Sequence, residues 1–120
     1  MADTERVICS SGDLVDSGDG VRFEVEVEGK REPAFAIRCE GRVYAYLNRC
    51  AHMPMELDWK PGKFFDVFGL VLICSTHGAT YQPNTGRCLG GPCFERGLVP
   101  VAVEERDGRV FLKDHPNGRR

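Results

Sequence analysis

Alternating apolar and polar residues along the chain predict a fold made of β-strands. From Phe23 to Val27, apolar residues take every second position and glutamates take the positions between them. This period of two is typical of a strand with one buried face. No window of the sequence has apolar residues at the spacing of a long amphipathic helix. We therefore expect an all-β protein.

Three longer segments predict β-hairpins, because each has turn residues between two apolar runs. They are residues 33–48 with a turn at Glu40-Gly41, residues 63–75 with a turn near Asp66 to Gly69, and residues 97–114 with a turn at Asp107-Gly108. The 14 glycines and 7 prolines of the 120-residue chain also favour many short strands. We expect two small sheets in a single domain.

Charge and hydropathy narrow the classes of function. Lys and Arg number 16, and Asp and Glu number 18, so we expect no basic surface for nucleic acid and no polybasic membrane signal. The N-terminal residues carry charges where a signal peptide has its apolar core. No apolar run approaches the ~18 residues of a membrane span. We expect a cytoplasmic protein that contacts neither nucleic acid nor a membrane.

Two cysteine–histidine pairs lie in the middle of the chain, Cys50 with His52 and Cys74 with His77. In a cytosolic chain, cysteines grouped with histidines indicate a metal site rather than disulfides. Structural zinc accepts two cysteines and two histidines, but a zinc finger places its histidines on a helix after both cysteines. Here each pair is mixed, and Gly78 directly follows His77. Mixed pairs suit a two-iron site with both thiolates on one iron and both imidazoles on the other, as in a Rieske [2Fe-2S] centre.

Three motifs in this region resemble the Rieske ferredoxin family. They are "CAH" at 50–52, "CSTHGATY" at 74–81 and "GGPC" at 90–93, within a resemblance that extends from about Arg42 to Val103. The family signature is C-x-H, a spacer, C-x-x-H-G, and then a loop with glycine and proline that covers the cluster. The spacer here, residues 53–73, is longer than in common ferredoxins, and we interpret the extra length as a longer hairpin.

The resemblance implies that Cys50 and Cys74 hold one iron of a single [2Fe-2S] cluster, and that His52 and His77 hold the other. It also implies a Rieske-like two-sheet β-sandwich with a small cluster-binding lobe on a larger base. We expect the base at about residues 1–47 and 94–113, the lobe at about residues 48–93, and a frayed tail at residues 114–120.

The residues around the motifs predict a low reduction potential. In high-potential family members a disulfide joins the two ligand loops, and a serine follows His-Gly. Met55 and Thr76 occupy the disulfide positions here, so that bridge cannot form, and Ala79 replaces the serine. Tyr81 stands where family members often have a tyrosine. Either its hydroxyl reaches a cysteine sulfur or its ring packs under the loop.

Gly90, Gly91 and Pro92 are expected to shape the cover loop, because a close approach of the backbone to the cluster requires small residues. Cys88 and Cys93 flank this loop. Their separation permits a disulfide, but we expect packed thiols in a reducing cytosol.

The spacer also carries four aromatic residues: Trp59, Phe64, Phe65 and Phe68. They form either the core of the lobe or an apolar docking patch near the cluster. We favour the core, because alternation along a strand would bury at least half of them.

The sequence lacks the residues for two other kinds of redox site, which leaves electron transfer as the predicted function. His115 is the one histidine besides the predicted ligands, so an oxygenase iron site with two further histidines is excluded. No dinucleotide fingerprint is present, so a flavin or nicotinamide site is not expected. Our leading prediction is a soluble Rieske ferredoxin, not itself an enzyme, that shuttles single electrons from a flavin-dependent reductase to an oxygenase or related terminal enzyme. Two alternatives stay open: the small subunit of a nitrite-reductase-like complex, and an interaction module with structural zinc.

Overall fold

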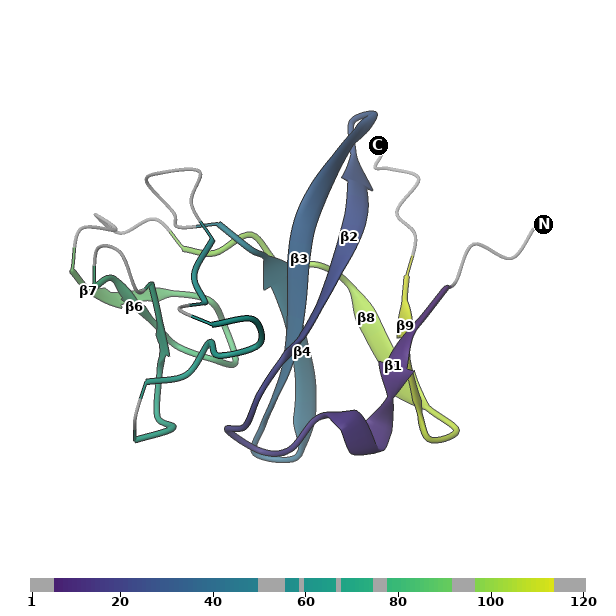
Figure 1. The fold of residues 1–120 in the computed structure, drawn as a ribbon, viewed down its shortest axis with the longest axis horizontal. Helices are drawn as coiled ribbons and strands as arrows, with labels where there is room; N and C mark the ends of the chain where they lie inside the picture. The colour runs from purple at the N-terminus through teal and green to yellow at the C-terminus, as the bar shows by residue number, and fades with distance from the viewer. Residues whose placement is uncertain are drawn as a thin grey trace.

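The computed structural model describes residues 6–49, 56–58, 60–66, 68–74, 78–91 and 97–113. In these residues the strands form three antiparallel three-stranded sheets, with strand orders β1-β9-β8, β2-β3-β4 and β5-β6-β7 (Figure 1). The elements are β1 (Arg6–Ser10), the 3-10 turn η1 (Ser11–Asp13), β2 (Val21–Val27), β3 (Lys30–Cys39), β4 (Arg42–Leu47), β5 (Leu72–Ile73), β6 (Thr80–Tyr81), β7 (Cys88–Gly90), β8 (Val103–Arg106) and β9 (Arg109–Leu112). The all-β prediction is confirmed.

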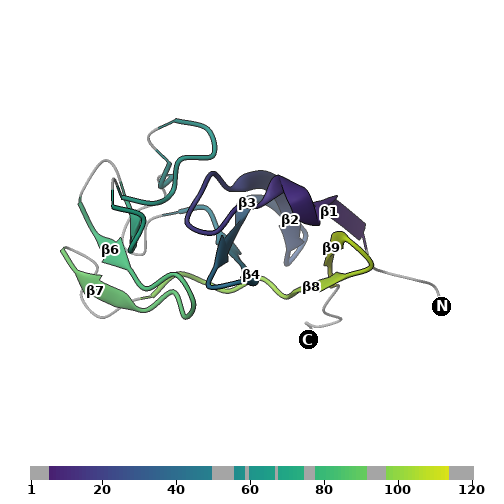
Figure 2. The same ribbon diagram turned by 90° about the horizontal axis from the view of Figure 1, so that it is seen from below.

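The β2-β3-β4 sheet lies between the other two sheets, as both ribbon views show (Figures 1 and 2). Strand β3 is covered on both faces. Phe35 and Ile37 are fully buried in the apolar cluster shared with the β5-β6-β7 side, and Ala36 is fully buried against Val110 of β9. Because successive side chains of a strand point to opposite faces, the large residues fill one interface and the small alanine permits close packing at the other.

Three hairpins of the first two sheets close with the same two-residue turn. Their central pairs, each with positive φ at both residues, are Glu28-Gly29, Glu40-Gly41 and Asp107-Gly108. Positive φ at both central residues matches the right-handed twist of the flanking strands, and glycine takes it at little steric cost. The two turns predicted for the second and third of these pairs are confirmed. The hairpin predicted for residues 63–75 also forms, with Phe65 bridged to Leu72 across a turn that begins at Asp66.

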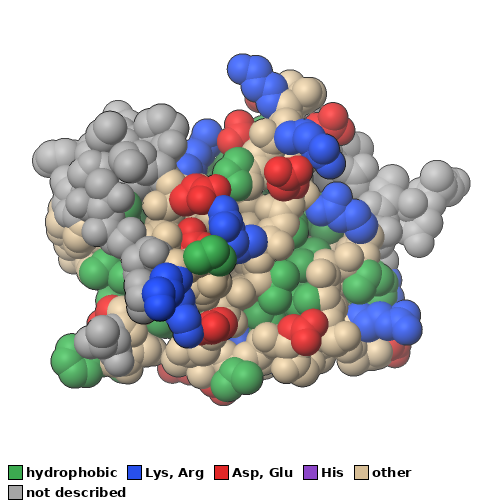
Figure 3. Space-filling view, viewed as in Figure 1, with side chains coloured by type: hydrophobic (Ala, Val, Ile, Leu, Met, Phe, Trp, Pro, Cys, Tyr) green, Lys and Arg blue, Asp and Glu red, His purple; other side chains and the backbone are tan. Residues whose placement is uncertain are grey.

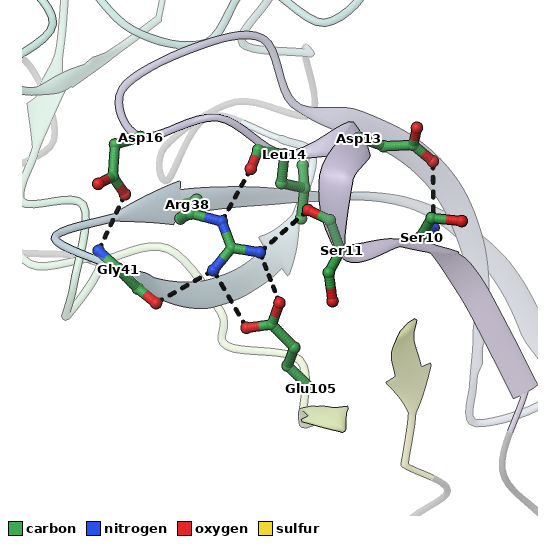
Figure 4. Close-up of polar contacts among 8 residues, drawn as sticks. All are labelled: Ser10, Ser11, Asp13, Leu14, Asp16, Arg38, Gly41 and Glu105. Atoms are coloured by element: carbon green, nitrogen blue, oxygen red, sulfur yellow. Dashed lines mark hydrogen bonds and ion pairs between the residues drawn. The ribbon is translucent and has the colours of Figure 1, made fainter. Parts of the chain in front are cut away.

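The Arg38 side chain joins the β2-β3-β4 sheet to the β1-β9-β8 sheet (Figure 4). The Arg38 guanidinium on β3 donates to the carbonyl oxygens of Leu14 (2.8 Å), Ser11 (3.1 Å) and Gly41 (3.0 Å). It also donates to both carboxylate oxygens of Glu105 on β8, at 2.6 and 3.1 Å. Two parallel N–H···O bonds to one carboxylate are the strongest form of this ion pair. The fork therefore fixes η1, the β3-β4 turn and β8 relative to one another.

The surface mixes charges of both signs on the face seen in Figure 3. On the β2-β3 hairpin, Arg31 lies 3.3 Å from Glu24, and Arg49 beyond β4 lies 3.6 Å from Glu32 of β3. In the described residues, no helix is long and apolar enough to cross a membrane. The division into a base and a lobe stays a prediction, and the tail at residues 114–120 lies outside the described residues.

Replacing Glu105 with glutamine tests the Arg38 network. The hydrogen bonds from Arg38 lower the pKa of the Glu105 carboxyl from its ordinary value of 4.5. The ion pair therefore contributes fully above that ordinary value, and its contribution is lost as the pH falls through the lower folded pKa. We expect Glu105→Gln to reduce the free energy of unfolding by about 1–2 kcal/mol at neutral pH, measured by urea denaturation. The difference from wild type should shrink in acid.

Glu104 provides the matched control, because its pairs with Arg106 and Lys113 are longer, at 3.5 Å each, and solvent-exposed. Glu104→Gln should change the free energy of unfolding by less than about 0.5 kcal/mol. Equal losses in the two variants, or a Glu105→Gln loss that is the same in acid and at neutral pH, would contradict the role given to Arg38.

Candidate metal centre

Cys74, one of the four predicted ligands, directly follows β5 and is fully buried. Its amide donates to the carbonyl of Ala79 (2.8 Å), and its carbonyl accepts from the amide of Gly78 (2.8 Å). Gly78 has a φ of +75°, which glycine adopts at little cost. These bonds hold Gly78 and Ala79 beside Cys74, and the positive φ of Gly78 explains why a glycine follows the predicted histidine ligand.

Among the described residues, those packed with Cys74 are apolar. Leu57, Ala79 and Tyr81 are fully buried in the same cluster. A thiolate among such side chains is costly unless a cation compensates its charge, and a metal ion bound to the sulfur provides that compensation. The residues around Cys74 therefore fit a metal ligand. Among the described residues no group of three ligating side chains gathers, and the other predicted ligands, Cys50, His52 and His77, lie outside the described residues.

The two residues predicted to tune the cluster lie beside Cys74. Ala79 contacts the same cluster, and Tyr81 on β6 pairs with Leu72 of β5 and with Cys88 of β7. The full burial of Tyr81 is compatible with both alternatives, the hydroxyl that reaches a sulfur and the ring that packs under the ligand loop. A tuning role for either residue stays a prediction.

The start of the predicted cover loop packs directly on the second ligand segment. A Cβ atom added to Gly91 would lie 2.8 Å from the Cα atom of Ala79 and 2.9 Å from the carbonyl oxygen of Gly78. Gly91 also has a φ of +84°. Of the described residues, a Cβ on Gly90 would meet only Thr80, whose hydroxyl lies at an ordinary 3.5 Å. Of the two glycines, Gly91 is the one that this close approach requires, and Pro92 lies outside the described residues.

A family model described as the Rieske [2Fe-2S] domain matches residues 4–111. The chain belongs to the Rieske [2Fe-2S] domain family. The family resemblance of the cysteine–histidine motifs is thus confirmed. Rieske domains bind one [2Fe-2S] cluster, so the predicted cofactor is confirmed as well.

Solved structures of Rieske ferredoxins have the same fold. The ferredoxin of carbazole 1,9a-dioxygenase from Nocardioides aromaticivorans IC177 is 20% identical, with a TM-score of 0.68 over 92% of this chain and 97% of that chain. The Sphingomonas yanoikuyae B1 ferredoxin is 21% identical, with a TM-score of 0.68 over 93% and 100%. A chain of the complex of reduced oxygenase and oxidized ferredoxin in carbazole 1,9a-dioxygenase is 23% identical, with a TM-score of 0.68 over 92% and 94%. No curated protein matches the chain.

The aromatic residues of this Rieske chain's long spacer separate into core and surface. Phe64 is fully buried and its ring stacks on Phe35 of β3, with centroids 3.9 Å apart. Phe65 is 8% exposed, whereas Phe68 at the hairpin tip is 79% exposed. The preference for core over docking patch is therefore correct for Phe64 and Phe65 and wrong for Phe68. Trp59 lies outside the described residues.

Cys88 on β7 is disulfide-bonded, so the expectation of a packed thiol at this position is wrong. Cys9, Cys39 and Cys74 are not in disulfides, which places the partner of Cys88 outside the described residues. Cys93, which the sequence permits as the partner, lies outside the described residues. Burial raises the pKa of the Cys9 and Cys39 thiols, which makes both poor nucleophiles at neutral pH.

A pair of polar residues with buried side chains, Asn48 and Asp58, lies beside the first ligand motif in sequence and was not predicted. Asn48 is 1% exposed, and its side chain hydrogen-bonds to Leu57 and Asp58. The available signal was an asparagine directly after an apolar strand and two residues before Cys50. Partners ten residues away along the chain cannot be read from such a local pattern.

Exchanging each glycine of the cover loop for alanine tests the close approach at Gly91. Gly91→Ala forces a strained φ and a clash with two backbone atoms, so we expect it to lower the free energy of unfolding by roughly 2 kcal/mol or more. It should also reduce the iron content per chain. Gly90→Ala is the control and should change stability by less than about 1 kcal/mol, with full iron content. Iron analysis and urea denaturation provide the two readouts, and equal behaviour of both variants would contradict the assignment.

Proposed function

We propose that this chain is a Rieske ferredoxin, a soluble carrier that shuttles single electrons and is not itself an enzyme. The observation that carries the proposal is the extent of the likeness. The Rieske model matches residues 4–111, and the two free-standing ferredoxins align over 97% and 100% of their own lengths. A chain that resembles a ferredoxin over the whole ferredoxin's length supports the same role.

The proposed ligand set assigns both thiolates to one iron and both imidazoles to the other. Cys50 and Cys74 hold the inner iron, and His52 and His77 hold the outer one. The complete burial of Cys74 supports an inner position for the thiolate-bound iron. When bound, the [2Fe-2S] cluster supplies a site that accepts and releases one electron. The protein's part is to hold the ligands and to keep water away from the sulfur side.

The proposed electron acceptor is an oxygenase or a related terminal enzyme. A similar chain, 23% identical, occurs in the complex of reduced oxygenase and oxidized ferredoxin in carbazole 1,9a-dioxygenase, which supports this class of acceptor. The proposed donor is a flavin-dependent reductase, which follows from the family resemblance of the motifs alone. We place the protein in the cytoplasm, where both partners would be available.

Visible absorption of the anaerobically purified protein is the decisive test of the cofactor and its ligands. We expect a brown protein that bleaches on dithionite reduction and contains about two irons per chain. Cys74→Ser should lose the colour and the iron, because a hydroxyl is a poor replacement for a thiolate ligand. Cys9→Ser, at a cysteine that packs against a different apolar cluster from that of Cys74, should keep both. A colourless wild-type protein with stoichiometric zinc would support the interaction-module alternative instead.

The proposed role as a shuttle has its own measurement. Size-exclusion chromatography of the protein from its native cells should show the chain free of a large partner, because a shuttle must dissociate after each transfer. A stable large complex would favour the nitrite-reductase-like subunit, and it would leave the cluster assignment intact.

The substitution Ala79→Ser tests whether the missing hydrogen-bond donor at this position keeps the reduction potential low. Ala79 cannot donate a hydrogen bond, whereas a serine hydroxyl could donate one to the cluster and favour its reduced, more negative state. We expect Ala79→Ser to raise the midpoint potential by up to about 60 mV, since ~59 mV corresponds to ~1.4 kcal/mol for one electron and that is the size of one hydrogen bond. Ala79→Gly changes the packing without adding a donor and should leave the potential near the wild-type value. An unshifted potential in cluster-loaded Ala79→Ser would refute the prediction.

A further inference from the structure

Asn48 directly follows strand β4 as a buried polar residue, two positions before the predicted ligand Cys50. Its amide donates to the carbonyl of Pro33 on β3 (2.8 Å), which fixes its backbone to the central sheet. Its side-chain oxygen accepts from the amide of Leu57 (2.9 Å), and its side-chain NH2 group donates to Asp58 Oδ1 (3.3 Å). Both ends of the carboxamide are therefore used.

Asp58 completes this arrangement on the other side. Its side chain is 2% exposed, so its charge depends on protein partners. Oδ1 accepts from Asn48, and Oδ2 accepts from the amide of Gly62 (3.0 Å). The Arg22 guanidinium on β2 lies 3.5 Å from Oδ2 and pairs with Glu56 at 2.7 Å. We call the Asn48–Leu57–Asp58 hydrogen bonds the clasp.

The clasp joins the residues at the two ends of the segment 49–56. Asn48 and Leu57 stand on either side of residues 49–56, the segment that contains Cys50 and His52. Leu57 is fully buried in the cluster that contains Cys74. The bond from Leu57 to Asn48 therefore joins three parts: the central sheet, the exit of the first ligand loop, and the core around the second ligand segment.

We propose that Asn48 and Asp58 are positioning residues for the first pair of cluster ligands, so that the clasp sets where Cys50 and His52 lie relative to Cys74. The inference rests on the proposed ligand set. The physical reason is that a ligand pair on an irregular loop acquires a defined geometry only if side chains fix the ends of that loop. Hydrogen-bonded partners beyond the ligands orient a metal site in the same way.

The clasp can be exchanged without losing a hydrogen bond, which provides a sharp test. Asn48→Asp alone places two carboxylates face to face, 3.3 Å apart in the wild-type geometry. Asp58→Asn alone provides one acceptor oxygen where both Asn48 and the Gly62 amide donate. In Asn48→Asp/Asp58→Asn, the new carboxylate accepts from Leu57 and from the new amide, whose oxygen accepts from Gly62. All hydrogen bonds of the clasp and of the Gly62 amide are again satisfied, whereas the ion pair between Arg22 and position 58 is lost.

The experiment measures the cluster itself in the full-length wild type and these three variants. The readouts are the EPR g-values of the dithionite-reduced protein, the visible circular dichroism, and the half-life of the cluster in excess chelator. We expect each single variant to shift the spectra and to shorten the half-life by about tenfold, the effect of one unsatisfied buried polar group. The double variant should recover the wild-type spectra and a half-life within about twofold of wild type.

Tyr46→Phe controls for a loss of stability alone. The Tyr46 hydroxyl donates to the carbonyl of Pro83 (2.8 Å) in a buried bond that involves none of the clasp residues. This variant should lower the urea midpoint of the apo-protein, as the single clasp variants do, but leave the EPR g-values unchanged.

Two failures are distinguishable. The positioning role would be overturned if cluster-loaded Asn48→Asp and Asp58→Asn had wild-type spectra and half-lives that follow the urea midpoint, as in Tyr46→Phe. That result would leave the ferredoxin proposal standing. A double variant as impaired as the singles would also overturn it. A wild-type protein without a [2Fe-2S] spectrum would remove the proposed function, and the clasp's role with it.

Discussion

One apolar cluster, shared by the central sheet and the β5-β6-β7 segment, is the constraint on which the rest of the structure depends. Phe35 and Ile37 of β3 enter it from one side, and Phe64, Leu72 and Cys74 enter it from the other. The contact is so close that a Cβ on Gly20 would lie 2.6 Å from the carbonyl oxygen of Ala36 and 2.8 Å from the Phe64 ring. Because a predicted ligand belongs to this cluster, the packing that stabilises the fold and the geometry of the metal centre cannot vary independently.

The strands beside the predicted metal centre can be short because this apolar cluster holds them in place. Strands β5 and β6 have two residues each and provide few ladder hydrogen bonds. Their position is set instead by buried side chains and by backbone contacts, such as the bonds from Cys74 to Ala79 and from Gly78 to Cys74. Irregular backbone can bring side chains from several segments toward one point, which a regular strand cannot do. The larger sheets supply the rigid support that such loops require.

The sequence predicted those features that depend on neighbouring residues. Alternation identified the strand from Phe23 to Val27, and the glycine turns at Glu40-Gly41 and Asp107-Gly108 located two hairpins. The order and spacing of the cysteines and histidines identified the cofactor, because mixed cysteine–histidine pairs are typical of a Rieske [2Fe-2S] centre. Pairing of β1 with β9 joins opposite ends of the chain and could not be predicted. The contacts of Asn48 were not predicted because its partners, Leu57 and Asp58, lie outside its local sequence pattern. The exposure of Phe68 was not predicted because it depends on whether another segment of the chain covers this side chain.

The clasp shows why a ligand motif alone underdetermines a redox centre. Cys50 and His52 identify the chemistry, but Asn48 and Asp58 lie outside the C-x-H pattern and fix the ends of its loop. The same holds for Gly91, which contacts the backbone of Ala79. Residues in these positions affect the hydrogen bonds and the packing around the predicted ligand segments, and such properties set the reduction potential of a cluster. Two chains with identical motifs can therefore carry electrons at different potentials, and the difference is expected in residues such as these.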